Sequence, residues 1–273
     1  MIEFPNAKIN LGLYITEKRP DGFHNLETVF YPLSLSDVLE ISIDYTRDFP
    51  IFTNTGLKVD SLPENNLVLR AYNQIRNEHI IPNVHTHLHK QIPFGSGLGG
   101  GSSNAAYTIK MLNQLFDLKL SSETILRYAR SLGSDCPFFL KNRPQIAYEK
   151  GDLTQNINIS LKGYHLMLIV PDFQINTKEA YQGVIPQKPQ HSLDQIIKEP
   201  ISRWKGSLTN DFEKSLAQRF PVIEKIKKQL YEAGADYASL SGSGSAIYGI
   251  FKSAPPKISF PGHYWVWQEK LKF

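Results

Sequence analysis

Apolar and polar residues alternate over the first part of the chain. Residues 7–15 alternate with a period of two, which places Lys8 and Asn10 together on the polar face. This period is that of a β-strand with one buried face. Strands are also expected at residues 26–33, 38–45, 84–89 and 264–267, and on both sides of a turn within 238–251. Residues 146–153 are interpreted as a strand and turn, and the strongly apolar segment 163–170 as a further strand.

Helical spacing of apolar residues is found in other segments. Leu67, Ala71 and Ile75 share one stripe and predict a helix over 67–79. Further helices are expected at 105–115, at 123–132 behind an N-cap at Ser121 or Ser122, and at 220–232. The segment 46–63 has weak periodicity and is interpreted as a hairpin with loops. The polar, proline-interrupted segment 187–200 is interpreted as a surface excursion.

A glycine-rich stretch leads directly into the helix expected at 105–115. Five glycines occupy the seven positions 95–101. Glycine admits positive φ and lets a ligand approach the main-chain N–H groups, and the start of a helix attracts anions. Ser102, Ser103 and Asn104 are expected to cap the helix or to offer hydroxyls to a phosphate or its metal. The stretch therefore predicts a phosphate-binding loop, consisting of Pro93, Phe94, Gly95, Ser96, Gly97, Leu98, Gly99, Gly100, Gly101, Ser102 and Ser103.

Other glycine-loop classes fit less well. A Walker A loop requires a lysine after its glycines, and none follows here. The spacing of Gly95, Gly97 and Gly100 matches the letters of a dinucleotide fingerprint, but the loop does not follow the first strand of a βαβ unit. The further motifs of a protein kinase are absent from the sequence.

Phosphoryl transfer needs a group that orients or deprotonates the attacking hydroxyl, and positive charge for the developing oxyanion. Asp135 suits the first role, because it stands in a tight segment between Gly133 and Pro137. Lys8 suits the second role if its strand face lines the same cleft.

Composition narrows the classes of partner. The chain has 273 residues, a formal net charge of +4 and one cysteine, Cys136. We expect no nucleic-acid partner because no dense Lys/Arg block is present, and no membrane partner because no apolar run reaches spanning length. The single cysteine excludes an internal disulfide and favours the cytoplasm. His85, His87 and His89 alternate on a strand about 7 Å apart, too far for one tetrahedral metal ion, so we expect them to face solvent and expect no protein metal centre.

Three segments in order resemble the GHMP kinases. They are the strand with Lys8, the glycine-rich stretch, and the turn Ser241-Gly242-Ser243-Gly244. The resemblance implies an α+β fold of two domains, 1–156 with a mixed β-sheet and helices and 157–273 as a ferredoxin-like α/β sandwich, with the active site in the cleft between them. It also implies ATP and Mg²⁺ as cosubstrate and ion, with Lys8 and Asp135 as the catalytic pair.

Within that superfamily the resemblance is to a branch that recognises cytidine. The residues that carry it are 7–13, 19–24 and 133–139. The resemblance implies ATP-dependent phosphorylation of the 2-hydroxyl of a cytidine-diphosphate-linked methylerythritol, in the non-mevalonate route to isoprenoid precursors, by a monomer or weak homodimer. The residues it places at the substrate are Asn10, Phe23, His24, Thr177 and Tyr181.

The sequence departs from this branch at a few positions. Phe23 stands where tyrosine is usual, Ser134 and Cys136 flank Asp135, and Glu149 replaces a glycine. The alternatives left open are another small-alcohol kinase of the mevalonate or homoserine type, a catalytically silent binding protein of the same fold, and a nucleotide-linked oxidoreductase.

Overall fold

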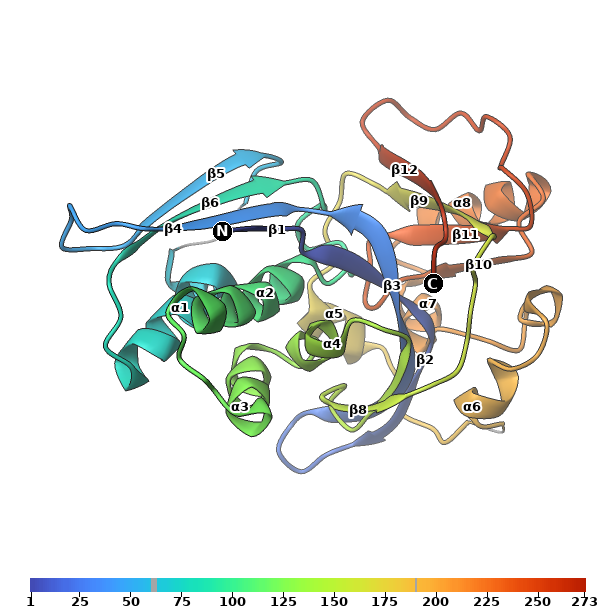
Figure 1. The fold of residues 1–273 in the computed structure, drawn as a ribbon. Helices are drawn as coiled ribbons and strands as arrows, with labels where there is room; N and C mark the ends of the chain where they lie inside the picture. Colours follow the sequence, from blue (N-terminus) through green and yellow to red (C-terminus); the bar gives the residue numbers. More distant parts are fainter. Residues whose placement is uncertain (60–62, 190) are drawn as a thin grey trace. The chain divides into compact units, whose positions relative to one another are not determined.

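The computed structural model describes residues 1–59, 63–189 and 191–273 (Figure 1). The chain forms two compact units. Unit 1 comprises Met1–Ala7, Leu35–Phe94 and Gly99–Asn142, and unit 2 comprises Lys8–Ser34, Gly95–Leu98 and Arg143–Phe273. The domain boundary at 156/157 stays a prediction.

Unit 1 contains a mixed four-stranded sheet. The order is β1-β4-β6-β5, and β5 pairs parallel with β6 whereas the other pairs are antiparallel. The hairpin predicted for 46–63 is wrong, because β5 lies beyond β6 instead of beside β4. The chain returns from β5 to β6 through a helix, and such a crossover makes neighbouring strands parallel. Residues 60–62 of that segment lie outside the described residues. The strands are β1 (Ile2–Glu3), β4 (Val38–Ile43), β5 (Ile51–Gly56) and β6 (Val84–Lys90).

Helices cover one face of this sheet (Figure 1). Ala71 and Ile75 of the predicted stripe are buried in the same core as Leu39, Ile41 and Leu112. The six-residue helix α4 was not predicted, because a segment this short shows no helical period. The helical elements are η1 (Pro63–Asn65), α1 (Leu67–Glu78), α2 (Gly100–Leu115), α3 (Ser122–Leu132) and α4 (Cys136–Lys141).

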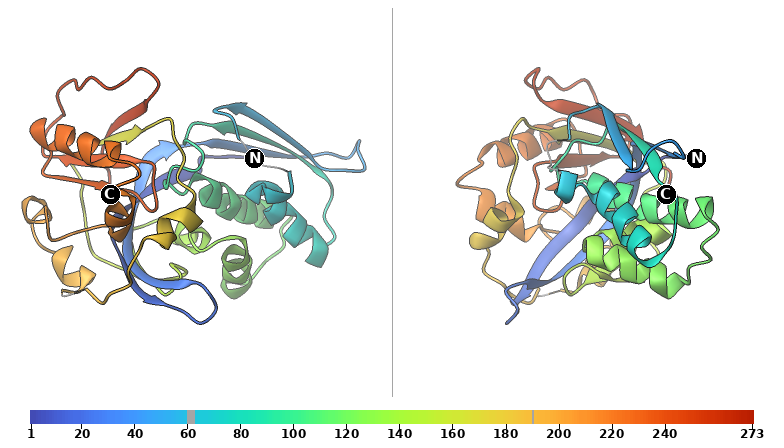
Figure 2. Two further views of the ribbon diagram at one scale, coloured as in Figure 1. Left: turned by 180° about the vertical axis from the view of Figure 1, so that it is seen from behind. Right: turned by 90° about the vertical axis from the view of Figure 1, so that its left-hand side faces the viewer.

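Unit 2 contains two four-stranded sheets, ordered β2-β3-β7-β8 and β10-β11-β9-β12. The helix α8 packs on the second sheet (Figure 2) and shares a core with Met167, Ile169 and Ile247. The bounds are β2 (Asn6–Lys18), β3 (His24–Ser36), β7 (Gln145–Tyr148), β8 (Leu153–Asn156), β9 (His165–Val170), α8 (Val222–Glu232), β10 (Tyr237–Leu240), β11 (Ile247–Phe251) and β12 (Trp265–Lys270).

Short helical elements lie between β9 and β10 in the sequence. They are α5 (Thr177–Gln182), α6 (Leu193–Ile196), η2 (Ile201–Arg203) and α7 (Asp211–Leu216). The segment 187–200, predicted as a surface excursion, is mostly exposed in its described part, but Leu193 and Ile197 are buried. Ser192 caps α6 with a hydrogen bond to the N–H of Gln195, so one short turn suffices to bury these two apolar side chains.

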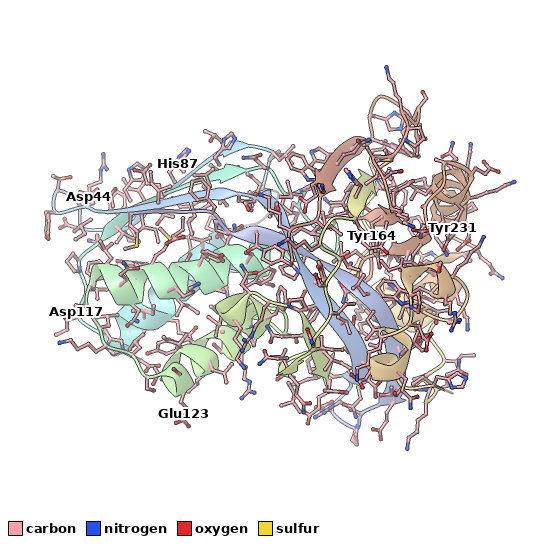
Figure 3. The ribbon with its side chains drawn as sticks, turned by 45° about the vertical axis from the view of Figure 1, so that its right-hand side comes forward. Asp44, His87, Asp117, Glu123, Tyr164 and Tyr231 are labelled. Atoms are coloured by element: carbon pink, nitrogen blue, oxygen red, sulfur yellow. The ribbon has the colours of Figure 1, made fainter. Side chains whose placement is uncertain are left out.

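Histidines line the outer face of the unit 1 sheet. His87 projects away from the helix layer (Figure 3). The Thr53 hydroxyl lies 3.2 Å from His85 Nε2 and 2.8 Å from His87 Nδ1, and the Thr55 hydroxyl lies 3.0 Å from both His87 Nε2 and His89 Nδ1. Over the described ranges, no group of three His, Cys, Asp or Glu side chains could hold a metal ion, and no helix is long and apolar enough to span a membrane.

Candidate active site

The glycine-rich loop takes the backbone shape that glycine permits. Gly95, Gly97 and Gly99 have φ of +67°, +80° and +72°. Gly99 is the N-cap of α2 and lies in the left-handed region, so the helix begins at Gly100. Capping by Ser102, Ser103 or Asn104 is therefore wrong, because these residues lie inside the first turns of the helix. The first N–H groups of a helix have no partner within the helix, and such groups attract anions. The anion-binding role of this loop stays a prediction.

The first half of the loop packs against the late serine-glycine turn of unit 2. A Cβ at Gly97 would lie 2.1 Å from the Ser241 carbonyl oxygen. The Ser241 hydroxyl donates to the Gly97 carbonyl over 3.0 Å, and the Ala246 N–H donates to the Ser96 carbonyl over 2.9 Å. Two of the three segments that carry the family resemblance therefore meet through their backbones.

The third segment, β2, joins them through its polar face. Lys8 is only 3% exposed, and its ammonium donates to Asn10 Oδ1 over 2.6 Å and to the Gly97 carbonyl over 2.9 Å. The Asn10 N–H in turn donates to the Ser241 hydroxyl over 3.3 Å. Lys8, Asn10, Gly97 and Ser241 thus form one buried polar cluster, which we call the Lys8 cluster.

Asp135 lies in unit 1, at the N-cap position of α4. Its half-buried carboxylate makes no capping hydrogen bond to that helix. Burial raises the pKa of the neighbouring Cys136 thiol to about 12, so this thiol stays protonated at neutral pH. At the other end of α4, the Asn142 amide donates to Asn6 Oδ1 over 2.8 Å and fixes the helix. Lys8 and Asp135 belong to different units, so their pairing stays a prediction.

Two of the residues expected at the cytosine lie together. The rings of His24 and Tyr181 are stacked with centroids 4.7 Å apart, and Phe212 meets Tyr181 edge-on at 4.9 Å. Burial, with a smaller effect of Lys18, lowers the pKa of His24 below its usual value of 6.5. The imidazole is therefore neutral at neutral pH.

Phe23 and Thr177 are more exposed than this ring pair. Phe23 is 59% exposed, and the Lys150 ammonium lies 5.3 Å from its ring centroid. Thr177 begins α5, and its hydroxyl lies 3.3 Å from the Ser243 hydroxyl of the late turn. Glu149, which replaces a glycine of the family, takes φ of +55° and so keeps a left-handed conformation.

Unit 1 contains a pocket that was not predicted from the sequence. Its volume is about 250 Å³, and it is lined mainly by apolar surface from Leu67, Val68, Leu88 and Phe94, with Asn65 and Lys90 at its polar positions. Gly101 and Asn104 of α2 also line it, so the pocket adjoins the glycine-rich loop. Its walls come from segments far apart in the sequence, and no local pattern could have identified them.

Comparisons with known proteins give the family and the fold of this chain. The family model for the GHMP kinases N terminal domain matches residues 66–143, and that for the GHMP kinases C terminal matches 193–259. The 4-diphosphocytidyl-2-C-methyl-D-erythritol kinase of Bacteroides fragilis is 51% identical over 253 residues, covering 92% of each chain. The protein of the same name from Bacteroides thetaiotaomicron is 48% identical over 267 residues, covering 97% of this chain and 96% of the relative.

Solved structures give the same result. The crystal structure of a 4-(cytidine 5'-diphospho)-2C-methyl-D-erythritol kinase superposes with a TM-score of 0.76 at 28% identity, covering 92% of this chain and 90% of the other. The fold and the two matching domains define a GHMP kinase. The chain belongs, within that class, to the family of 4-diphosphocytidyl-2-C-methyl-D-erythritol kinases.

Proposed function

We propose that this protein transfers the γ-phosphoryl group of ATP to the 2-hydroxyl of 4-(cytidine 5'-diphospho)-2-C-methyl-D-erythritol, in the non-mevalonate synthesis of isoprenoid precursors. The observation that carries the proposal is the Lys8 cluster, in which a buried ammonium is held against the glycine-rich loop. The relatives at 48–51% identity carry the name of this kinase.

The phosphates of ATP would bind at the first turn of α2, where Gly99 and Gly100 open the helix. The adjoining apolar pocket would take the adenine ring, since a volume of about 250 Å³ suits a purine-sized group. Gly95 and Gly97 would let the chain approach the phosphates closely.

Mg²⁺ would accompany ATP. This ion prefers oxygen ligands, keeps several waters and is bound in kinases largely by substrate phosphates. The buried Ser103 hydroxyl makes no hydrogen bond to any described residue, so an oxygen donor is available beside the loop. Ser103 is thus the residue that would hold the ion, which would neutralise charge on the phosphates.

In this proposal Asp135 orients the 2-hydroxyl and accepts its proton, and Lys8 stabilises the negative charge that develops on the transferred group. The hydrogen bonds from Lys8 to Asn10 and Gly97 fix the direction of the ammonium before substrate binds. Asn10 would also contact the hydroxyls or diphosphate of the substrate.

Cytosine would be recognised by aromatic faces. Tyr181 and Phe23 would stack on the base, and the neutral His24 would hydrogen-bond to it, with Thr177 near the diphosphate or sugar. Because His24 now covers the face of Tyr181, its imidazole would have to move aside for the base. A cytoplasmic location and a monomer or weak homodimer remain part of the proposal.

A substrate panel tests the proposal. Purified protein is given Mg-ATP with the cytidine substrate, mevalonate or homoserine, and formation of ADP is followed. We expect turnover with the cytidine substrate and competitive inhibition by CDP. Turnover on mevalonate or homoserine alone would assign the chain to another small-alcohol kinase, and ATP binding without any transfer would indicate a silent binding protein.

A further inference from the structure

Asp37 is a buried acid that the proposed reaction leaves without a role. It lies between β3 and β4 and is 0% exposed. Its Oδ2 accepts hydrogen bonds from the Lys90 ammonium over 2.6 Å and from the Asn104 amide over 2.9 Å. Its Oδ1 accepts from the backbone N–H groups of Gln91 over 2.8 Å and Ile92 over 2.9 Å.

The residues that donate these hydrogen bonds flank the glycine-rich loop on both sides. Gln91 and Ile92 lie directly before the loop, which starts at residue 93, and Asn104 follows its last residue, Ser103. One carboxylate group therefore fastens both ends of an eleven-residue segment (93–103). An anion site depends on fixed N–H directions, and fixing the ends of a loop reduces the conformations that its backbone can take.

Lys90 extends this contact to the nucleotide pocket. Its ammonium lies 2.9 Å from the place that a Cβ of Gly100 would occupy, so it packs under the first turn of α2. Lys90 and Asn104 both line the pocket of about 250 Å³. The same cluster thus supports the phosphate end and the base end of the proposed ATP site.

A contribution to the stability of the fold does not by itself explain the buried ion pair of Asp37 and Lys90. Taking two charges out of water is costly, and an apolar pair of similar volume often stabilises a fold as well or better. Here the pair is accompanied by two backbone donors and one amide, all at the ends of the loop. This arrangement favours a role in fixing geometry.

We propose that Asp37 is a positioning residue for ATP: by fastening both ends of the glycine-rich loop, it sets the directions of the N–H groups that receive the donor phosphates. This inference rests on the proposed function in assigning ATP to that loop. It implies that Asp37 acts on the phosphates of ATP far more than on its adenosine part or on the cytidine substrate.

The test is Asp37→Asn, which keeps the acceptor for Gln91 and Ile92 but can turn an amide NH₂ toward the Lys90 ammonium and Asn104. The matched control is Asp211→Asn in unit 2, which alters another carboxylate that accepts a backbone N–H, that of Ile15 over 2.8 Å. Dissociation constants for ATP and adenosine are measured by calorimetry, and KM for each substrate by steady-state kinetics.

For Asp37→Asn we expect the dissociation constant and KM for ATP to rise at least tenfold. Adenosine affinity and KM for the cytidine substrate should change less than threefold, and the control should change none of these values by that much. Unchanged ATP affinity in folded Asp37→Asn, or equal losses for both substrates, would overturn the inference.

A second variant decides the matter if Asp37→Asn does not fold. Asn104→Ala removes only the hydrogen bond to Asp37 at the far end of the loop. We expect it to weaken ATP binding at least threefold more than adenosine binding. Equal weakening of both would contradict the positioning role of Asp37. Calorimetry needs no acceptor substrate. A wild-type protein that binds ATP but does not phosphorylate the cytidine substrate would therefore contradict the proposed function. The role of Asp37 would still be tested by the ATP affinities of the variants.

Discussion

Burial changes what a single residue type can do, and Lys8 is the clearest case. A lysine on an alternating strand ordinarily points to solvent, but Lys8 is 3% exposed and donates to two fixed oxygens. Such an ammonium needs little reorganisation when charge develops nearby, which is the condition for strong electrostatic stabilisation.

A single substitution tests the proposed catalytic role of Asp135. Asp135→Asn keeps the size of the side chain and removes its ability to accept a proton, so kcat should fall by about 10²–10⁴-fold while KM for both substrates changes little. Steady-state kinetics measure this, with circular dichroism to check folding. A kcat within threefold of the wild type would exclude Asp135 as the base.

The lowered pKa of His24 predicts a pH dependence of substrate binding. Burial is the main cause of the shift from 6.5, so the imidazole is neutral above that pH and gains a proton only below it. KM for the cytidine substrate should be constant from pH 7 to 8 and should rise as the pH falls below 6.5.

His24→Gln is the control for this profile, because its side chain hydrogen-bonds without titrating. Its KM should be flat over the same range. A wild-type KM that stays flat down to pH 5 would show that protonation of His24 does not affect recognition.

At the scale of elements, the glycine-rich loop depends on a backbone approach that only glycine allows. Gly97 has φ of +80°, and a Cβ there would lie 2.1 Å from the Ser241 carbonyl oxygen. Gly163 has φ of +92° but no atom within 4 Å of its Cβ position. An alanine at Gly163 would therefore add backbone strain alone, whereas an alanine at Gly97 would add backbone strain and steric overlap.

Gly163→Ala should cost about 1–2 kcal/mol, the penalty of an L-residue in the left-handed region, and should leave kinetics unchanged. Gly97→Ala should cost more and should also raise KM for ATP, because the loop must move away from Ser241. Urea denaturation and steady-state kinetics measure both effects. Equal stability losses with unchanged KM would show that the approach of Gly97 to Ser241 is unimportant.

The contact between α1 and α3 predicts how the protein responds to acid. Hydrogen bonds from Arg127 and Tyr128 lower the pKa of Glu78 from 4.5 to about 2. A lowered carboxyl pKa contributes stability above the unfolded value of 4.5, and the contribution is lost as the pH falls from there through about 2.

Glu78→Gln should therefore be less stable than the wild type at pH 7, and the difference should shrink as the pH falls toward 2. Urea midpoints at pH 7, 4 and 3 measure this difference. A difference that is the same at all three values would show that the ion pair does not set the acid response.

For the whole molecule, periodic patterns predicted the longer elements well. The strand over 7–15 and the helix over 67–79 are present as β2 and α1. The helix α1 buries one face of its repeat, but residues 6–15 of β2 are buried on both faces, so the prediction of a single buried face is wrong for this strand. The short helices α4 to α7 were not predicted from the sequence, because elements of four to six residues show no period. The parallel pairing of β5 follows from a crossover that local residues do not encode.

Some residues of the candidate site could likewise be predicted from the sequence, and others could not. The glycine-rich loop could be chosen from the sequence, because glycine spacing is a local signal. Strand alternation placed Lys8 and Asn10 on one face, but the substrate role of Asn10 came from the family resemblance. The pocket of unit 1 and the Asp37 contacts could not be predicted, because residues such as Val68, Leu88 and Asn104 meet only after folding. The roles of Phe23, Thr177 and Tyr181 came from family resemblance and stay predictions.

The central claim is that this protein phosphorylates one hydroxyl of one cytidine-linked polyol. The most direct measurement is ³¹P NMR of the product formed from ATP and 4-(cytidine 5'-diphospho)-2-C-methyl-D-erythritol. We predict one new phosphomonoester signal in amounts equal to the ADP formed, with the diphosphate signals of the substrate retained. This signal should lack three-bond coupling to a carbinol proton, because C2 carries a methyl group and no hydrogen. A phosphomonoester that couples to a carbinol proton, or inorganic phosphate as the only new signal besides those of ADP, would contradict the proposed reaction.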